Sequence, residues 1–441
     1  MNAFLDMMRL FYHRRFFTKA QIEAYQLKEL RKLVHFARDH SPYYAKSLEA
    51  FHFDTLDEYR SLPQIDKSLL MKNFDTINTQ GLSLDDAMAY ALQKEFNKDY
   101  LGYYKDRYVL GLSSGTSGNK GLFITDKALT RKLPFVFLAR SGLPLSLLPY
   151  RILFCLRVFS QGFSDINSPL IKLHYAPTMT APERLIEDIN NRRINILMAP
   201  PSLVRVLLPF AKEIKVKLMR IVCYAEVLEK EEKHRFETVF NTKVIEIYQA
   251  SEGQMASACP HGNLHINEDL VYVELLDNEG VPVQVEQRAQ MMLVTNLVNT
   301  AQPLIRYAMN DLIILKDDCP CGSHFRVIDS IVGRQDDVMH FNTKNGKEQL
   351  VFPDVMSRWI ITYSDLIREF RVTLKNKQQL VIDLDCFDGN INKNEIREGL
   401  KQKIVHELNH YDIQCELIIN ITKITLPIDK HKMKRFNVVN E

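Results

Sequence analysis

Short apolar runs that alternate with helical segments limit the fold of this chain more than any other feature. Four such runs occupy residues 152–156, 194–198, 221–224 and 244–248. Strands that alternate with helices favour a mostly parallel sheet with helices packed on it. We therefore predict an α/β fold for the middle of the chain.

The segment between the first two runs has the features of a helix. Thr180 is a good N-cap, and Pro182 suits a first turn. Leu185, Ile186 and Ile189 share one face at helical spacing. We expect a helix here that begins after Thr180.

Two polar stretches follow the predicted strands at the places where ligands of such sheets bind. Tyr224-Ala225-Glu226 ends the third apolar run, and the stretch 248–253 (Tyr-Gln-Ala-Ser-Glu-Gly) ends the fourth. An aromatic ring beside a small residue can stack on a nucleotide base, and the carboxylate of Glu252 is an oxygen ligand suited to Mg²⁺. The alternative is a pair of strand ends with solvated glutamates.

A loop rich in glycine and hydroxyl side chains lies earlier in the chain, between two apolar stretches. Its residues are Ser113, Ser114, Gly115, Thr116, Ser117, Gly118, Asn119, Lys120 and Gly121. Glycines let the backbone approach an anion closely, and the N–H groups, hydroxyls and lysine can donate to it. The order Asn-Lys-Gly differs from the Gly-Lys-Ser/Thr of a Walker motif, which disfavours a P-loop NTPase. An ordinary long hairpin loop is the alternative.

Three cysteines and one histidine in two loops form a candidate metal site. Cys259 and His265 lie in the first loop, and Cys319 and Cys321 lie in the second. Three thiolates and one imidazole complete a tetrahedral set for structural zinc. We choose His265 over His261 because His261 belongs to a tight Cys-Pro-His turn. Unlinked reduced thiols are the alternative.

The charge balance and the apolar content exclude several classes of protein. Lys and Arg total 57 against 54 for Asp and Glu, without the basic excess of a nucleic-acid-binding protein. No apolar run approaches the roughly 20 residues that span a bilayer, and the N-terminus is charged where a signal peptide is apolar. The seven cysteines are mostly isolated, which fits a reducing compartment. We expect a cytoplasmic protein with no nucleic-acid partner and no transmembrane segment.

Residues 1–50 are predicted to form helices that pack on the core. Their apolar stripe consists of Leu27, Leu30, Leu33, Val34 and Ala37. The basic aromatic segment from Leu10 to Lys19 has a second interpretation, as a helix that lies on a membrane surface. Tyr12 and His13 argue against this interpretation because they interrupt the polar face.

The loop 113–121 and the stretches 224–226 and 248–253 resemble signature motifs of the adenylate-forming enzymes, the acyl-CoA synthetase superfamily. Three later stretches resemble further motifs of the same superfamily. The later stretches are Gln302–Asp311 (Gln-Pro-Leu-Ile-Arg-Tyr-Ala-Met-Asn-Asp), Gly333–Asp337 (Gly-Arg-Gln-Asp-Asp) and the tail 426–435 (Leu-Pro-Ile-Asp-Lys-His-Lys-Met-Lys-Arg). The segment 30–44 and the Cys, His, Cys, Cys set are similar to the phenylacetate-CoA ligase-like branch. The chain departs from the motifs where Tyr224 and His431 replace glycines and where Met309-Asn310 replaces Thr-Gly.

The resemblance implies a role for each matching residue. Lys432, Glu252, Thr116 and Lys120 would be catalytic, with Glu252 as the ligand of Mg²⁺. The ATP or AMP contacts would come from Ser113, Ser114, Gly115, Thr116, Ser117, Gly118, Lys120, Ala225, Glu226, Tyr248, Asp311 and Arg334. Within this set, Tyr248 would contact adenine, and Asp311 and Arg334 would reach the ribose.

The resemblance also implies the architecture and the reaction. We expect a large N-terminal domain (residues 1–335) of mostly parallel sheets covered by helices, and a small mobile α+β domain (336–441) that carries Lys432. The implied reaction activates a carboxylic acid with ATP to an acyl-adenylate and transfers it to coenzyme A. A carrier protein, an amine, or no acceptor at all are alternatives, as is a degenerate nucleotide-binding regulatory module. A homodimer is allowed as the assembly.

Overall fold

The computed structural model describes residues 3–97, 99, 101–113, 120–156, 161–387, 392–424 and 434–439. The predicted site residues Ser114, Gly115, Thr116, Ser117, Gly118 and Lys432 lie outside these ranges. Among the described residues, no helix combines the length and the apolar character that crossing a membrane requires.

The chain begins with helices, as predicted. They are α1 (Ala3–Phe16), α2 (Lys19–His40), α3 (Pro42–Ser47), α4 (Leu56–Tyr59), α5 (Lys67–Lys72), α6 (Phe74–Ile77) and α7 (Leu84–Phe96). α2 starts at a capping box in which Thr18 and Gln21 satisfy each other's backbone N–H groups. Of its predicted apolar stripe, Leu30, Leu33, Val34 and Ala37 are buried and Leu27 is partly buried.

A hairpin of β1 (Tyr108–Leu112) and β2 (Leu122–Asp126) precedes the central sheet. The central sheet has the strand order β13-β14-β9-β8-β7-β6-β5-β3-β4. Its parallel half contains β3 (Tyr150–Cys155), β4 (Ile171–Ala176), β5 (Ile196–Ala199), β6 (Arg220–Cys223) and β7 (Val244–Ala250). Its antiparallel half contains β8 (Gly253–Ala258), β9 (Leu264–Ile266), β13 (Asp311–Lys316) and β14 (Val327–Arg334).

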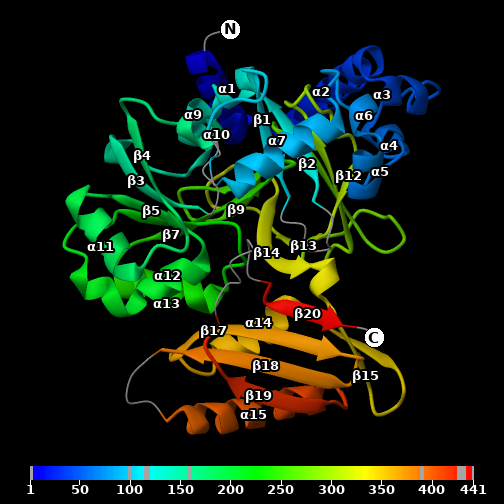
Figure 1. The fold of residues 1–441 in the computed structure, drawn as a ribbon. Helices are drawn as coiled ribbons and strands as arrows, with labels where there is room; N and C mark the ends of the chain where they lie inside the picture. Colours follow the sequence, from blue (N-terminus) through cyan, green and yellow to red (C-terminus); the bar gives the residue numbers. More distant parts are fainter. Residues whose placement is uncertain are drawn as a thin grey trace.

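Helices cover the parallel half on both faces (Figure 1). They are α9 (Leu133–Arg140), α10 (Gln161–Ser164), α11 (Pro182–Asn191), α12 (Pro201–Leu207) and α13 (Lys230–Phe240), with the 3₁₀ turns η1 (Leu145–Leu147) and η2 (Leu208–Glu213). The short helix α8 (Lys127–Thr130) lies against β2 of the hairpin. The expected N-cap at Thr180 is wrong, because α11 begins after Ala181, which makes no side-chain cap. Pro182 fixes this start, since its ring presets the backbone of the first helical residue.

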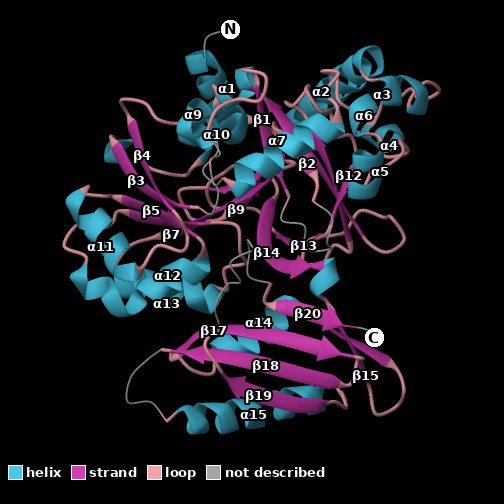
Figure 2. Ribbon diagram, in the orientation of Figure 1, coloured by secondary structure: helices cyan, strands magenta, loops and turns pink. Residues whose placement is uncertain are grey.

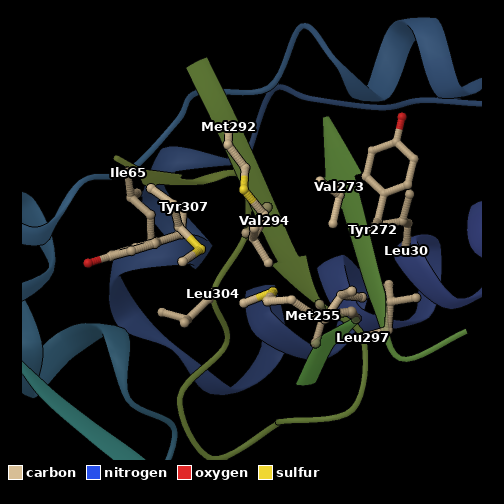
Figure 3. Packing of buried hydrophobic residues seen from close by; sticks show 14 of the residues in the cluster. Leu30, Ile65, Met255, Tyr272, Val273, Met292, Val294, Leu297, Leu304 and Tyr307 are labelled. Carbon is tan, nitrogen blue, oxygen red and sulfur yellow. The ribbon is translucent and has the colours of Figure 1, made fainter. Parts of the chain in front are cut away.

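A three-stranded antiparallel sheet joins the N-terminal helices to the central sheet. Its strands are β10 (Val271–Leu276), β11 (Met291–Asn296) and β12 (Tyr307–Met309). Figure 3 shows Leu30 from the helical region beside Tyr272 of this sheet, and Ile65 beside Tyr307. This cluster thus joins segments far apart in sequence, whereas the parallel half of the central sheet has clusters of its own.

The remaining elements form a smaller unit, here called the C-terminal unit (339–439), which follows the 3₁₀ turn η3 (Gln335–Asp337). It contains β15 (Met339–Asn342), β16 (Glu348–Val351), α14 (Pro353–Ile361), β17 (Ile367–Lys375), β18 (Gln379–Cys386), α15 (Lys393–His410), β19 (Glu416–Ile421) and β20 (Phe436–Val439). Its sheet, in the order β19-β18-β17-β20, packs with α14 and α15 in a core of its own (Figure 2). The predicted fold class, a large α/β part with a small α+β part, is confirmed; the exact boundary at residue 336 stays a prediction.

Candidate active site

One cavity of about 700 Å³ collects the described site residues that the sequence predicted. It lies beyond the carboxyl ends of the parallel strands and is also lined by residues of the C-terminal unit, including Lys434 and Phe436. The predicted residues on its wall are Ser113, Lys120, Ala225, Glu226, Tyr248, Glu252, Asp311 and Arg334. The predicted residues that face this common space therefore come from five separate stretches of sequence.

The centre of this cavity is a hydrogen-bonded group at the meeting point of three strands. The Tyr248 hydroxyl on β7 donates to Oδ2 of Asp311 at 2.5 Å. Arg334 Nε lies 3.6 Å from Oδ1 of the same carboxylate, because Asp311 on β13 pairs directly with Arg334 on β14. Burial first, and then the Asp311 charge, raises the pKa of Tyr248 well above its usual value, so it remains a donor at neutral pH. A carboxylate held in this way can accept from a pair of ligand hydroxyls.

Glu252 stands at the tight turn between β7 and β8, within the same electrostatic environment. Its backbone carbonyl accepts a bond of 2.7 Å from the Asn296 side chain, which fixes the turn. Burial raises the pKa of the Glu252 carboxyl to about 7, with a smaller contribution from Asp311, while Arg334 and Lys67 oppose the shift. A carboxylate that is poorly solvated gains strongly from a bound metal ion.

The β1–β2 hairpin closes the base of the predicted phosphate loop. The Gly121 N–H donates to Ser113 Oγ at 2.7 Å, and the Ser113 N–H donates to the Gly121 carbonyl at 2.8 Å. Lys120 forms an ion pair with Glu95 of α7. An anion at the loop would therefore compete with Glu95 for this lysine.

Glu226 has a role in the structure that the sequence did not indicate. Its carboxylate accepts from the backbone N–H of Ser202 at 3.0 Å and from the Ser202 hydroxyl at 2.8 Å, at the start of α12. Arg435, just before β20, lies 3.9 Å from the same carboxylate. Ala225 beside it has φ +66°, a strained left-handed conformation that turns the chain along the cavity wall.

Buried charges join the large part of the molecule to the C-terminal unit at this edge of the cavity. Arg205 of α12 donates to Glu232 of α13 at 2.5 Å, and across the boundary to Glu369 of β17 at 3.2 Å and to the Arg368 carbonyl at 3.1 Å. Arg435 completes the group with bonds of 2.7 and 3.0 Å to Glu369. The position of Arg435, three residues after Lys432 in the sequence, is thus fixed by paired charges.

The opposite end of the cavity is apolar. Its wall is formed by side chains from α9, α10 and the neighbouring strands: Leu133, Val136, Phe137, Leu156, Phe163 and Leu173. All of them except Val136 belong to the hydrophobic cluster that packs α9 and α10 on the sheet, and Val136 belongs to the smaller cluster around Leu10 of α1. A ligand that bridges the two ends would place a polar group beside Asp311 and an apolar group against α9.

The four predicted metal ligands come together on the far side of β8. The Cys259 and Cys319 sulfurs are 3.6 Å apart, Cys321 Sγ is 3.4 Å from His265 Nε2, and all four ligand atoms lie within 4.8 Å of one another. Ligands at about 2.3 Å from a tetrahedral zinc are about 3.8 Å apart, so the set fits this ion. His265 Nδ1 bonds the Phe325 carbonyl at 2.9 Å, which leaves Nε2 facing the sulfurs. Burial first, and then Arg14, lowers the pKa of His265 to about 4, which keeps the imidazole neutral.

Sequence reasoning missed several residues of the cavity region. Glu95 and Lys67 come from a polar helical stretch without a motif, and only the tertiary fold brings them to the loop and to Glu252. Arg205, Glu232 and Glu369 also lack a local signal, since each reads as an ordinary charge on a helix or strand. Their partners are far away in the sequence, as with Arg205 and Glu369, so no local spacing pattern could predict these contacts.

Glu229, the N-cap residue of α13, provides a test of this part of the cavity. Burial, and then Asp354 of the C-terminal unit, raises its pKa to about 8. Between about pH 4.3, where an unfolded glutamate titrates, and pH 8 the folded protein keeps a proton that the unfolded chain has lost. Stability should therefore fall as the pH rises through this window, and Glu229→Gln should flatten the fall. Denaturant unfolding at pH 5, 6.5 and 8 measures the free energy of unfolding of the wild type and of the variant.

The matched control is Glu231→Gln, two residues along the same helix but exposed. It should follow the wild-type profile at all three pH values. If Glu229→Gln loses stability with rising pH as steeply as the wild type, the buried position of this carboxyl is contradicted.

No protein-family model and no curated protein matches this sequence. Solved structures match over nearly its whole length. The structure of 2-hydroxyisobutyryl-CoA ligase in the postadenylation state with 2-HIB-AMP has a TM-score of 0.72 at 16% identity, covering 98% of this chain and 91% of that one. The same ligase with 2-HIB-AMP and CoA in the thioesterification state has a TM-score of 0.59 at 17% identity, with 97% and 91% covered. The anthranilate CoA ligase AuaEII with anthranoyl-AMP has a TM-score of 0.57 at 13% identity, with 74% and 66% covered. The chain has the fold of the adenylate-forming CoA ligases.

Proposed function

We propose that this protein activates a carboxylic acid with ATP and transfers the acyl group to coenzyme A. One observation carries the proposal: Tyr248, Glu252, Asp311, Arg334 and Lys120 line a single cavity at the strand ends. Ligases of the same fold have been captured with acyl-AMP and with CoA at their sites. We prefer coenzyme A to a carrier protein as the acceptor because one of these structures holds CoA itself.

The reaction would proceed in two steps. A carboxylate oxygen of the acid attacks the α-phosphorus of ATP, and pyrophosphate leaves with the electron pair of the broken P–O bond. The thiolate of coenzyme A then attacks the acyl carbon, and AMP leaves. Both steps build negative charge on oxygens, which fixed donors and cations stabilise best where water is excluded.

The residues of the cavity can be assigned to these tasks. Asp311 would accept from the ribose hydroxyls with Arg334 beside it, and the Tyr248 ring would lie against adenine. Ser113 and Lys120 at the base of the loop, with Thr116 and Ser117, would hold the leaving phosphates. Lys432 would approach the α-phosphate, guided by the Arg435–Glu369 pair that follows it. Glu252 would hold Mg²⁺, which neutralises phosphate charge when bound.

The arrangement of the two parts supports an adenylation conformation. The chain superposes better on the ligase in its postadenylation state, at a TM-score of 0.72, than on the same ligase in its thioesterification state, at 0.59. We propose that residues 336–441 move as a domain between two such states, with the hinge at Asp336. This motion would carry Lys432 away after the first step.

We also propose that Cys259, His265, Cys319 and Cys321 bind a structural zinc ion. Their distances and the neutral His265 support this site. A zinc ion would link the β8–β9 turn to the loop before β14 and would take no part in the reaction. The same set favours the phenylacetate-CoA ligase-like branch, in agreement with the resemblance of residues 30–44.

Removal of the Glu252 carboxylate tests the activity. Glu252→Gln should reduce acid-dependent exchange of labelled pyrophosphate into ATP at least about tenfold, which corresponds to about 1.4 kcal/mol of barrier. The assay uses a panel of aryl and fatty acids with Mg²⁺. The control Glu231→Gln replaces an exposed glutamate of α13 and should exchange pyrophosphate as fast as the wild type. If the exchange rate of Glu252→Gln equals that of the wild type, Glu252 has no role in the reaction.

Metal removal tests the zinc site. The purified protein should contain about one zinc per chain, and a strong chelator should lower its melting temperature because metal binding adds to folding free energy. Cys321→Ser should lose the zinc, whereas Cys415→Ser, a cysteine of the C-terminal unit, should keep it. A wild-type zinc content far below one per chain would refute the site.

A further inference from the structure

Helix α1 packs on the body of the protein with its polar side chains. Asp6 and His13 are buried to 7% and 5% exposure, and His13 Nδ1 lies 3.1 Å from Asp269 Oδ2. Lys132 lies 3.3 Å from Asp6, and Arg14 donates to the Ser257 carbonyl at 3.0 Å. The ionic groups of this helix are therefore used mainly for attachment to the protein.

The outer face of α1 is apolar. Its exposed side chains are Phe4 (52%), Leu5 (59%), Met8 (49%), Tyr12 (54%) and Phe16 (63%), here called the α1 stripe. At 3.6 residues per turn these positions fall within an arc of about 120°. Scattered exposed apolar residues are normal on a protein surface, but a contiguous row marks an interaction site. Elsewhere such residues also occur singly, as with Val239 on α13 and Val405 on α15.

In the sequence, Tyr12 and His13 argued against a membrane-surface helix, but their positions in the structure remove this objection. His13 points inward, so it does not interrupt the outer face. Tyr12 belongs to the stripe, with its ring 5.3 Å from that of Phe16. An aromatic residue with one polar end suits the boundary between water and lipid.

The charges around the stripe indicate the partner. Arg9 and Lys19 have exposed side chains, at 49% and 71%, and Arg9 Nη2 lies 3.6 Å from Asp6 Oδ1. Arg15 is exposed beside Phe16, and its guanidinium keeps its charge while it donates to the Cys321 carbonyl. Lys19 has only a loose contact, 3.9 Å, with Asp318. Asp6, the acidic residue of α1, is buried on the inner face. A row of apolar residues flanked by cations is complementary to a bilayer that contains anionic lipids.

We propose that the α1 stripe binds an anionic membrane surface as an interfacial helix. Figure 1 shows α1 at the end of the molecule opposite α14 and α15. Docking through α1 would therefore leave the C-terminal unit on the water side. Binding combines burial of the stripe in the headgroup region with attraction of Arg9, Arg15 and Lys19 to lipid phosphates.

Vesicle sedimentation tests this proposal with the full chain. The wild type should bind vesicles of phosphatidylcholine with about 30% phosphatidylglycerol at least about tenfold more tightly than pure phosphatidylcholine vesicles at physiological ionic strength. The triple variant Met8→Ser/Tyr12→Ser/Phe16→Ser should lose this binding about tenfold or more. The control Val239→Ser/Val405→Ser, which removes exposed apolar groups elsewhere, should bind as the wild type does.

A second measurement reports directly on the stripe and does not depend on how well the triple variant folds. Tyr12→Trp should show fluorescence that is quenched by brominated lipid, whereas the single native tryptophan, Trp359, lies in the C-terminal unit and should not respond. Failure of the wild type to sediment with anionic vesicles, or no quenching at position 12, would overturn the proposal. Self-association that the triple variant abolishes, without vesicle binding, would assign the stripe to a second copy and also overturn it.

Discussion

The arrangement of the cavity depends on the buried charges between Arg205, Glu232, Glu369 and Arg435. Charges out of water are costly unless they are paired, and a buried ion pair adds little net stability compared with an apolar contact. The group here is also incompletely satisfied, because Arg205 Nη2 and Glu232 Oε2 lack hydrogen-bond partners among the described residues. We infer that this contact sets the position of the C-terminal unit precisely without holding it permanently. Separation of the two parts would let water solvate the same charges.

The same contact explains how the tail is placed at the cavity. Arg435 lies immediately before β20, which pairs in parallel with β17. Glu369 on β17 and Glu226 beside α12 lie on two sides of its guanidinium. The position of Arg435 therefore follows from pairings within the C-terminal unit and from its contact with Glu226 of the large part.

The sequence predicted β3, β5, β6 and β7 of the parallel half and the set of four metal ligands because both depend on local patterns, whereas β4 was not predicted. Apolar runs such as 221–224 and 244–248 form β6 and β7, and the two Cys-containing loops meet as their residue types suggested. β20 was not predicted because its four residues follow a basic segment whose composition is typical of a solvated tail. Glu95 and Lys67 escaped because their polar helices show no motif. The N-cap of α11 was misplaced by one residue because proline overrides a side-chain cap at Thr180.

The N-terminal helix, the metal-ligand loops and the apolar cavity wall form one connected structure. Arg15 donates to the Cys321 carbonyl, and Arg14 bonds Ser257 on β8, close to Cys259. Arg140 at the end of α9 donates to Asp269 at 2.6 Å, the same carboxylate that His13 contacts. Anchoring of α1 at a surface would therefore act on a rigid part of the molecule and leave the C-terminal unit free.

The central claim is that the cavity forms an acyl-adenylate. The most direct measurement uses an acid that supports turnover, labelled with ¹⁸O in its carboxyl group, and analyses the nucleotide product by mass spectrometry. Attack of the carboxylate on the α-phosphorus leaves one carboxyl oxygen on the phosphate, so the account predicts AMP that carries one ¹⁸O atom. Formation of ADP, or AMP without the label, would contradict it.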